Sequence, residues 1–253
     1  MSSIGTGYDL SASQFSPDGR VYQIEYAGKA VEMSGTVIGM RGKDGIVLAV
    51  EKIVTSALYE DDAATRIFTV DKNIGIAIAG LLADGRYIVD IARQEAANFR
   101  QQFERTIPLK QLTERVSAYV HAYTLYSAVR PFGVSVILAS WDEEQGPQLY
   151  KIDPSGTSFG YFACASGKAE QQAKTEMEKL KFAEMSVDDL VQNAGKIIYL
   201  VHDELRNKDF HFEMSLVSKD TKGLHRLNPQ PWYDQAVQAG LAAKNEDDSD
   251  NEI

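Results

Sequence analysis

The most informative stretch of this chain is Phe15-Ser16-Pro17-Asp18-Gly19-Arg20-Val21-Tyr22-Gln23-Ile24-Glu25-Tyr26-Ala27. Its residues Pro17-Asp18-Gly19 are typical of a turn, because proline presets the backbone angle φ and glycine accepts a positive φ. Apolar residues then recur at helical spacing from Val21 to Ala27. We therefore expect a turn followed at once by a short helix over about 19–32, with Asp18 capping its first N–H groups.

The composition limits the possible functions. The chain has 253 residues and a net charge of −10, which suits one large domain with a substantial core. The acidic balance argues against nucleic-acid binding, which needs a basic face. We expect no membrane span and no secretory signal, because no apolar run is long enough. One cysteine, Cys164, excludes an internal disulfide framework and fits a reducing compartment. No metal-ligand spacing is found among His121, His202, His211 and His225.

Alternating residues near the N-terminus predict two β-hairpins. In the last strand of the second hairpin, Ile74, Ile76 and Ile78 alternate with glycine and alanine. Small residues on the second face indicate close packing there, so both faces of this strand should be covered. The four predicted strands cover residues 36–41, 46–50, 66–70 and 74–79.

The order of the remaining elements predicts the layers of the fold. Two helices should follow, with apolar stripes from Ile88 to Phe103 and from Leu112 to Tyr126. Strands return over about 134–165, two more helices follow over about 169–180 and 186–201, and strands come last. This order predicts an α+β fold, a four-layer αββα sandwich of two antiparallel sheets flanked by helices.

A series of motifs shares one likeness. They are Tyr8-Asp9, Phe15-Ser16-Pro17-Asp18-Gly19-Arg20, Gln23, Glu25-Tyr26-Ala27, Gly80-Leu81-Leu82-Ala83-Asp84, Tyr123-Thr124-Leu125-Tyr126-Ser127-Ala128-Val129-Arg130-Pro131-Phe132-Gly133 and Asp153-Pro154-Ser155-Gly156. Together they resemble α-type subunits of the 20S proteasome over nearly the whole chain. The resemblance implies the αββα sandwich of N-terminal-nucleophile hydrolases, but with a noncatalytic role.

The resemblance also implies an assembly. The chain would take one place in a heteroheptameric outer ring with six other α subunits, stacked on the β ring that cuts peptides. Regulatory particles or activators would dock on this ring through their C-terminal tails. The subunit would control substrate entry in ubiquitin-dependent and ubiquitin-independent protein degradation, in cytoplasm and nucleus, without a cofactor or metal.

Two sets of site residues follow from the resemblance. The first is an open-state cluster for the N-terminal gate arm, residues 1–14, which would help to close the axial pore. Its members are Tyr8, Asp9, Pro17 and Tyr26, where aromatic rings can stack on a proline and a carboxylate can accept a phenol hydrogen bond. The second is an activator-tail pocket whose members are Arg66, Gly80 and Leu81. The family usually has lysine where Arg66 stands, and the two cations bind a carboxylate with different geometry.

An alternative is an autoprocessed N-terminal threonine hydrolase with Thr36 as nucleophile. In that chemistry the free amine of the threonine serves as base, and Gly35-Thr36 resembles the bond that β-type subunits cut. The helix expected over about 19–32, however, lies in the segment that cleavage would discard. Matching Lys43-Asp44 to the β-type pattern places Gly35 at the nucleophile position. Arg66 stands where the β-type catalytic lysine falls, and a guanidinium stays protonated.

The C-terminal end is acidic. Residues 245–253 contain five acidic residues and no basic one, so we expect a disordered tail after a single domain over 15–244. Ser249 is followed by Asp250 and Glu252 and resembles an acidophilic kinase site. Phosphorylation there would add about −1.5 to −2 charges.

Overall fold

The computed structural model describes residues 7–56, 58–60, 63–203 and 210–251, with side chains up to Glu246. In chain order the elements are α1 (Tyr22–Glu32), β1 (Val37–Arg41), β2 (Gly45–Ile53), β3 (Ile67–Asp71), β4 (Ile74–Gly80), α2 (Leu82–Phe103), α3 (Leu109–Ala122), β5 (Val134–Asp142), β6 (Gly146–Ile152), β7 (Ser158–Gly160), β8 (Ala163–Ser166), α4 (Glu170–Glu178), the 3-10 helix η1 (Phe182–Glu184), α5 (Val187–Leu200), β9 (Phe210–Ser218), β10 (Arg226–Leu227) and α6 (Trp232–Asn251).

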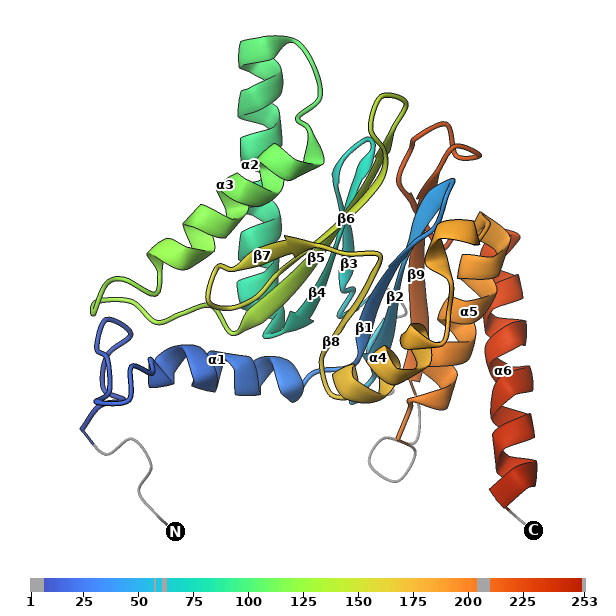
Figure 1. Ribbon diagram of the computed structural model, residues 1–253, viewed down its shortest axis with the longest axis horizontal. Helices are drawn as coiled ribbons and strands as arrows, with labels where there is room; N and C mark the ends of the chain where they lie inside the picture. Colours follow the sequence, from blue (N-terminus) through green and yellow to red (C-terminus); the bar gives the residue numbers. More distant parts are fainter. Residues whose placement is uncertain (1–6, 57, 61–62, 204–209, 252–253) are drawn as a thin grey trace.

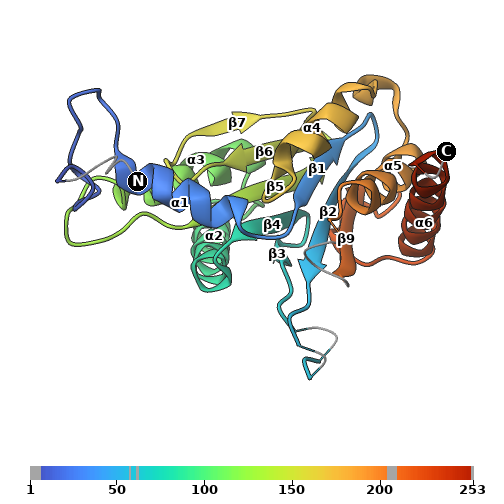
Figure 2. The ribbon, with the colours of Figure 1, turned by 90° about the horizontal axis from the view of Figure 1, so that it is seen from below.

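The strands form two five-stranded antiparallel sheets. The first has the order β10-β9-β2-β1-β8 and the second the order β3-β4-β5-β6-β7. Helices α2 and α3 cover the outer face of the second sheet, and α4, α5 and α6 cover the outer face of the first (Figures 1 and 2). The predicted αββα sandwich and both predicted hairpins are therefore confirmed.

Strand β4 shows why the sheets stack so closely. All seven of its residues are buried. Ile76 and Ile78 pack against the helices α2 and α3, whereas Ala77 and Ala79 belong to the core between the sheets. At Gly39 on the facing sheet, an added Cβ would lie 2.9 Å from side-chain atoms of β5 and β6. The prediction that both faces of β4 are covered is confirmed.

Helix α1 lies across one end of the sandwich, beside β4 and β5 (Figure 1). It begins at Tyr22, and its N-cap residue Val21 makes no side-chain cap hydrogen bond. The prediction that Asp18 caps this helix is therefore wrong. The turn closes on itself instead, because the N–H group of Arg20 donates to Ser16 Oγ at 3.0 Å and the N–H group of Ser16 donates to the Arg20 carbonyl at 2.9 Å.

Helix α6 has no counterpart among the elements expected from the sequence. It packs against α5 through small residues: a Cβ on Gly195 would lie 1.9 Å from the Ala236 carbonyl oxygen, and one on Gly240 would lie 2.3 Å from the Tyr199 ring. Because these contact residues are small, the sequence of α6 shows only a weak apolar stripe. The helix continues to Asn251, so it extends into residues 245–251, where we expected disorder. The domain boundary at 244 stays a prediction.

Other elements differ from the predictions in detail. Helix α3 ends at Ala122, so Tyr126 lies beyond the helix and is 64% exposed rather than part of the core. Helix α5 begins with a capping box, since Ser186 and Asp189 bond each other's backbone N–H groups. No helix within the described ranges has the length and apolar character needed to cross a bilayer.

Candidate functional site

The turn at Pro17-Asp18-Gly19 is here called the signature turn. Residues that precede this turn contact helix α1, which follows it. The Tyr26 hydroxyl donates a hydrogen bond to Asp9 Oδ2 at 3.2 Å, and Gln23 Nε2 donates to the Asp9 carbonyl. Desolvation and the neighbouring Asp9 carboxylate raise the pKa of the Tyr26 phenol. The structure thus brings together Asp9 and Tyr26 of the open-state cluster, across the turn.

The other two members of this cluster lie at the surface. Tyr8 and Pro17 are both exposed. In the part of the chain described here, neither makes a hydrogen bond to Asp9 or Tyr26. The ring of Tyr26 instead stacks on Tyr22, with centroids 6.3 Å apart. The cluster is therefore half formed within the single chain, and its role in an open state stays a prediction.

Arg66 and Gly80 of the predicted pocket are in direct contact. Arg66 Nη1 donates to the Gly80 carbonyl oxygen at 2.7 Å, and burial lowers the pKa of the guanidinium. The adjacent Leu81 lies at the surface, and its N–H group donates to the Gly133 carbonyl at 2.9 Å. The structure brings these residues together at the ends of β3 and β4, whereas their proposed ligand stays a prediction.

Glu213 holds the Arg66 segment from the neighbouring sheet. Its carboxylate accepts the backbone N–H groups of Arg66 at 3.0 Å and Ile67 at 3.3 Å, and burial raises its pKa. Sequence reasoning missed this residue. The only signal was a carboxylate in the middle of an apolar strand, which marks a buried charge that needs partners.

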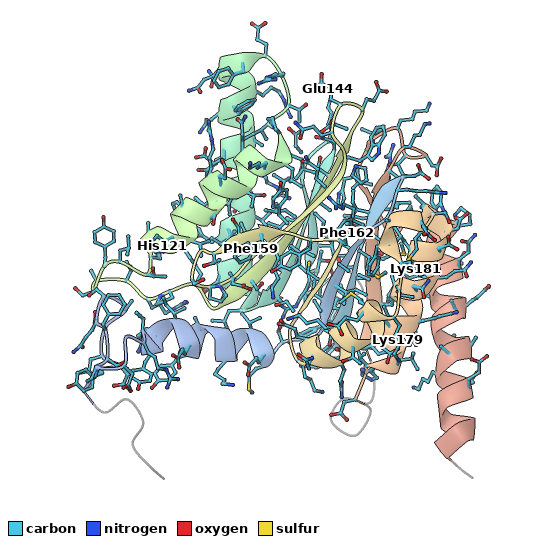
Figure 3. All side chains as sticks on the ribbon, viewed as in Figure 1. His121, Glu144, Phe159, Phe162, Lys179 and Lys181 are labelled. Carbon is cyan, nitrogen blue, oxygen red and sulfur yellow. The ribbon has the colours of Figure 1, made fainter. Side chains whose placement is uncertain are left out.

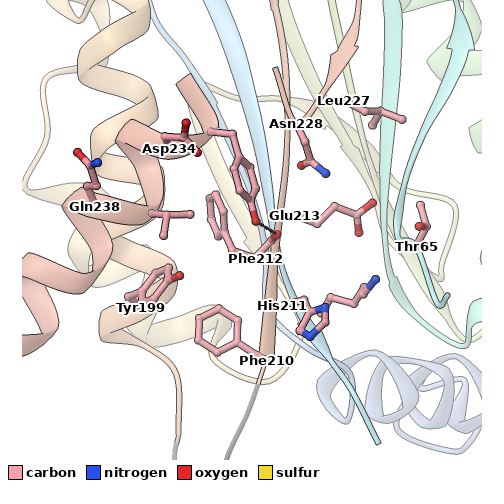
Figure 4. A pocket seen from close by; sticks show the side chains of 13 residues that line it. Thr65, Tyr199, Phe210, His211, Phe212, Glu213, Leu227, Asn228, Asp234 and Gln238 are labelled. Atoms are coloured by element: carbon pink, nitrogen blue, oxygen red, sulfur yellow. Dashed lines mark hydrogen bonds between the residues drawn. The ribbon is translucent and has the colours of Figure 1, made fainter. Parts of the chain in front are cut away.

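Glu213 also lines a cavity of about 790 Å³ between β9 and α6 (Figure 4). The Tyr233 hydroxyl donates to the Phe212 carbonyl at 3.1 Å across this cavity. The remaining wall is mixed: Tyr199 and Phe210 contribute aromatic rings, and Thr65, Asn228 and Asp234 are among its polar residues. This cavity therefore combines aromatic and polar side chains with a carboxylate that already serves the fold.

Thr36 lies in the interior and not at a catalytic surface. It is 0% exposed, and both its amide nitrogen and its Oγ1 donate to Glu51 Oε2, at 3.0 and 2.8 Å. His202 Nδ1 lies 2.6 Å from the other oxygen of the same carboxylate. A Cβ on Gly35 would lie 2.0 Å from the Glu51 carbonyl oxygen. The Thr36 nitrogen is thus an internal amide fixed by the core, not the free amine that hydrolysis requires.

Cys164 and His225 are two further reactive side chains that are buried. Cys164 lies between the sheets, and burial raises the pKa of its thiol to about 12. His225 accepts or donates a 2.8 Å hydrogen bond with Thr69 Oγ1, and burial lowers the pKa of its imidazole to about 4. Among the described residues, no group of His, Cys, Asp and Glu side chains could hold a metal ion.

Comparison with known proteins defines the class. A family model described as "Proteasome subunit" matches residues 31–217, and a second one, for the N-terminal signature of A-type proteasome subunits, matches residues 8–30. The chain therefore belongs to the proteasome subunit family.

Individual relatives define the type. The alpha type-3 proteasome subunit of Drosophila melanogaster is 72% identical over 252 residues, which cover 100% of this chain and 99% of the relative. The alpha type-3 proteasome subunit of Spinacia oleracea is 50% identical over 250 residues, covering 99% of this chain and 100% of the relative. The probable alpha type-7 proteasome subunit of Saccharomyces cerevisiae is 45% identical over 252 residues, covering 98% of this chain and 87% of the relative.

The chain is thus an α-type subunit, a noncatalytic component of the outer ring of the 20S core particle, and it assembles with other proteasome subunits. The opening residues 5–11 and the acidic end resemble the eukaryotic alpha type-3 subunit. The identities above confirm that likeness. The prediction that the chain is noncatalytic is confirmed as well, and the hydrolase alternative at Thr36 is set aside.

Proposed function

We propose that the subunit gates substrate entry through its N-terminal arm, residues 1–14. The observation that carries this proposal is the hydrogen bond from Tyr26 to Asp9, because it joins the arm at Asp9 to helix α1. Tyr8 and Pro17 are exposed next to this pair. Their exposure leaves them accessible, and they would complete the cluster when the arm of a neighbouring subunit or an activator moves against them.

The experiment replaces Tyr26 by phenylalanine in the assembled particle. This change removes the hydroxyl group and keeps the ring, so activator-stimulated peptide hydrolysis should fall by roughly two- to tenfold, the range expected from one hydrogen bond. Tyr126→Phe is the matched control, because Tyr126 is exposed on the loop after α3. Stimulation that is equal in both variants would contradict the gating role of the Asp9–Tyr26 pair.

We propose further that Arg66, Gly80 and Leu81 form a pocket for the C-terminal tails of regulatory particles or activators. Arg66 already donates one N–H group to the Gly80 carbonyl. A guanidinium carries five N–H donors, so Arg66 has donors beyond the one bonded to Gly80 that a tail carboxylate could meet. The Arg66 guanidinium is buried, and its donors have a fixed geometry. We therefore expect this pocket to bind activator tails more weakly than a pocket with a mobile lysine.

Binding of an activator's C-terminal peptide to the assembled particle tests this pocket. Arg66→Gln should reduce the share of binding that depends on the peptide carboxylate. Arg105→Gln is the control and should not reduce it, because Arg105 lies in the connection between α2 and α3. A peptide with an amidated C-terminus lacks the carboxylate and should bind both variants and the parent particle equally. If the peptide with a free carboxylate also bound equally well to both variants and to the parent particle, the pocket would have no role.

The partners and the location follow the same proposal. The chain takes one place in a heteroheptameric ring with six other α subunits, stacked on the β ring, in cytoplasm and nucleus. Ser249, whose side chain lies outside the described residues, is a phosphorylation site in the acidic end. Native mass measurement of the assembly tests the ring composition, and a phosphopeptide map in which Ser249 is always unmodified would contradict the modification.

A further inference from the structure

Two distant segments of the chain meet at the proposed activator-tail pocket. One is Gly80-Leu81-Leu82-Ala83-Asp84, which joins the end of β4 to the first turn of α2, and the other is Arg130-Pro131-Phe132-Gly133, which leads into β5. The second segment comes from the end of α3, beside His121 in Figure 3, and runs back past α1 to β5 (Figure 1). The contact between the two segments therefore bears on how the pocket residues in the first one are held.

Asp84 makes this contact through its carboxylate. Its Oδ2 accepts hydrogen bonds from Arg130 Nη1 at 2.6 Å and from the Gly133 N–H group at 3.0 Å, and its Oδ1 accepts one from Arg130 Nη2 at 2.9 Å. The hydrogen bond from Arg130, with that from Gly133, holds the pKa of this carboxyl below its usual value. Asp84 is buried, whereas the side chain of Arg130 is 62% exposed. A bidentate pair with one buried partner keeps its geometry better than an exposed ion pair does.

This use of Asp84 differs from what its place in α2 predicts. Asp84 is the third residue of the helix, where an acidic side chain ordinarily bonds the backbone N–H group of the N-cap residue, as Asp189 does in α5. In α2 the N-cap residue is Leu81, and its N–H group donates instead to the Gly133 carbonyl at 2.9 Å. The Asp84 carboxylate therefore holds a distant segment of the chain in place of the start of its own helix.

Gly133 connects the ion pair to the pocket. Besides bonding Leu81, its carbonyl lies so close to Gly80 that a Cβ on Gly80 would be 2.2 Å from the oxygen, and Gly80 has a φ of +117°. The Gly80 carbonyl in turn accepts Arg66 Nη1 at 2.7 Å. The position of Gly133 thus fixes the Gly80 carbonyl to which the guanidinium of Arg66 is bonded.

We propose that Asp84, paired with Arg130, is a positioning residue of the activator-tail pocket and acts by fixing Gly133. A displaced Gly133 would move the Gly80 carbonyl and, with it, the Arg66 donors that meet the tail carboxylate. This inference rests on the pocket of the proposed function, and it adds a pair of residues that do not touch the tail themselves.

A direct role of Arg130, in which its exposed guanidinium binds the tail carboxylate, makes the opposite prediction for Asp84. If Asp84 positions the pocket, its loss weakens tail binding. If Arg130 binds the tail, the loss of Asp84 frees two guanidinium N–H donors and strengthens tail binding. The sign of the change therefore separates the two roles.

Binding of an activator's C-terminal peptide to the assembled particle, with a free and with an amidated C-terminus, tests the positioning role. The part of the carboxylate-dependent binding that Arg66→Gln removes is the share of this pocket. Asp84→Asn and Arg130→Gln should each remove at least about half of that share, because each breaks the bidentate pair. Arg130→Lys, which keeps the charge without the planar fork, should remove less than Arg130→Gln.

Glu95→Gln is the matched control. Glu95 lies on the same helix and pairs with Arg115 at 2.9 Å, but it is about 20 Å from Leu81 along the helix, at 1.5 Å per residue. This variant should keep the whole share. If Asp84→Asn does not enter the particle, Asp84→Glu takes its place, since its longer side chain keeps the charge and shifts it. Positioning then predicts a loss of tail binding, and direct binding by Arg130 predicts none.

The combination with Arg66→Gln shows whether both changes act at one site. In Arg66→Gln/Arg130→Gln, tail binding should fall no further than in Arg66→Gln alone. A further fall, stronger binding in the Asp84 variant or unchanged binding in Arg130→Gln would overturn the positioning role while the pocket stands. If Arg66→Gln itself left the binding of the free-carboxylate peptide unchanged, the proposed pocket would fail, and this inference with it.

Discussion

At the scale of single residues, Thr36 has a structural role, because it is bonded to a buried carboxylate. Glu51 Oε2 accepts both the amide N–H and the hydroxyl of Thr36, and the other carboxylate oxygen faces His202. Each of these groups would be unpaired in the interior without the others, and an unpaired buried polar group costs about 1–3 kcal/mol. The network therefore holds the start of β1 against β2 and the end of α5.

We predict that Thr36→Val lowers the free energy of unfolding by about 1–3 kcal/mol, because the Glu51 carboxylate loses a hydroxyl donor in the interior. Urea denaturation of the purified chain measures this change. The rate of peptide hydrolysis per assembled particle should stay at the parent value. Thr36→Ser, which keeps the hydroxyl, is the control for the stability effect. A particle whose hydrolysis fell in proportion to the Thr36 substitution would contradict the noncatalytic role.

His225 predicts a dependence of stability on pH. Burial lowers the pKa of its imidazole from 6.5 to about 4 in the folded chain. Above pH 6.5 the imidazole is neutral in both states, so its contribution to stability is complete there. As the pH falls from 6.5 towards 4, the unfolded chain binds the proton first, and the folded state loses stability. Between pH 7.5 and 5 this amounts to about 2 kcal/mol.

Urea denaturation at pH 7.5 and pH 5 measures this loss. In His225→Gln the part of the pH dependence that comes from this imidazole should vanish, while other titrating groups remain. His121→Gln is a matched control, because His121 is exposed at the end of α3. If the difference between the two pH values were the same in His225→Gln as in the parent, the imidazole would not be the cause.

At the scale of single elements, the contact between α5 and α6 depends on small residues. Helix α5 begins with a capping box and packs an apolar face against the first sheet. Its outer side meets α6 at Gly195, where the two backbones come close together. The contact works because no Cβ intervenes there.

We predict that Gly195→Ala lowers the free energy of unfolding by about 1–3 kcal/mol, the usual cost of overpacking. The reason is that the new Cβ would lie 1.9 Å from the Ala236 carbonyl oxygen, which forces α6 away. Thermal unfolding of the purified chain measures the effect. Gly28→Ala is the matched control in α1, because its Cβ would meet nothing within 4 Å. There, alanine should stabilise by about 0.5–1 kcal/mol through helix propensity. Equal effects of the two substitutions would contradict the packing argument.

At the scale of the whole molecule, the proposed gate arm is connected to helix α1. Asp9 of the arm accepts the hydrogen bond from Tyr26, and α1 is fixed to the sandwich by the buried residues Ala27 and Val31. If the arm gates the pore as proposed, its movement would act on a helix that is held by the core.

From the proposed gating role we predict that deletion of residues 2–9 raises the basal peptide hydrolysis of the assembled particle, because one closing arm would be lost. The arms of the six other α subunits in the proposed ring would still close part of the pore, so the increase should be small, and it should shrink when an activator is added. Hydrolysis of a short fluorogenic peptide, with and without activator, measures both effects. Basal hydrolysis at or below the parent value would contradict a closing role for this arm.

Local patterns in the sequence were sufficient for the layers and for the class of protein. The alternation of isoleucine with small residues in β4 predicted a strand covered on both faces, and the motif from Phe15 to Ala27 predicted the family. The strand depends on neighbours in the chain, so its periodicity carries that prediction. The family was predicted from the resemblance of the motif to known α-type subunits. Helix α6 escaped prediction because glycine and alanine at its contact with α5 produce little apolar periodicity.

The site contacts depended on tertiary structure. Glu51 meets Thr36 and His202, and Glu213 meets Arg66, across separations of 15 to 151 residues. Glu51 lies on β2 and reaches Thr36 beside the neighbouring strand β1 and His202 after α5, whereas Glu213 on β9 reaches across to the other sheet. No local pattern encodes such contacts, because they need strand pairing and packing between distant parts of the chain. Thr36 is buried by the same packing. For this reason the motifs could name the family, while the fold alone decided that the threonine is held by the core.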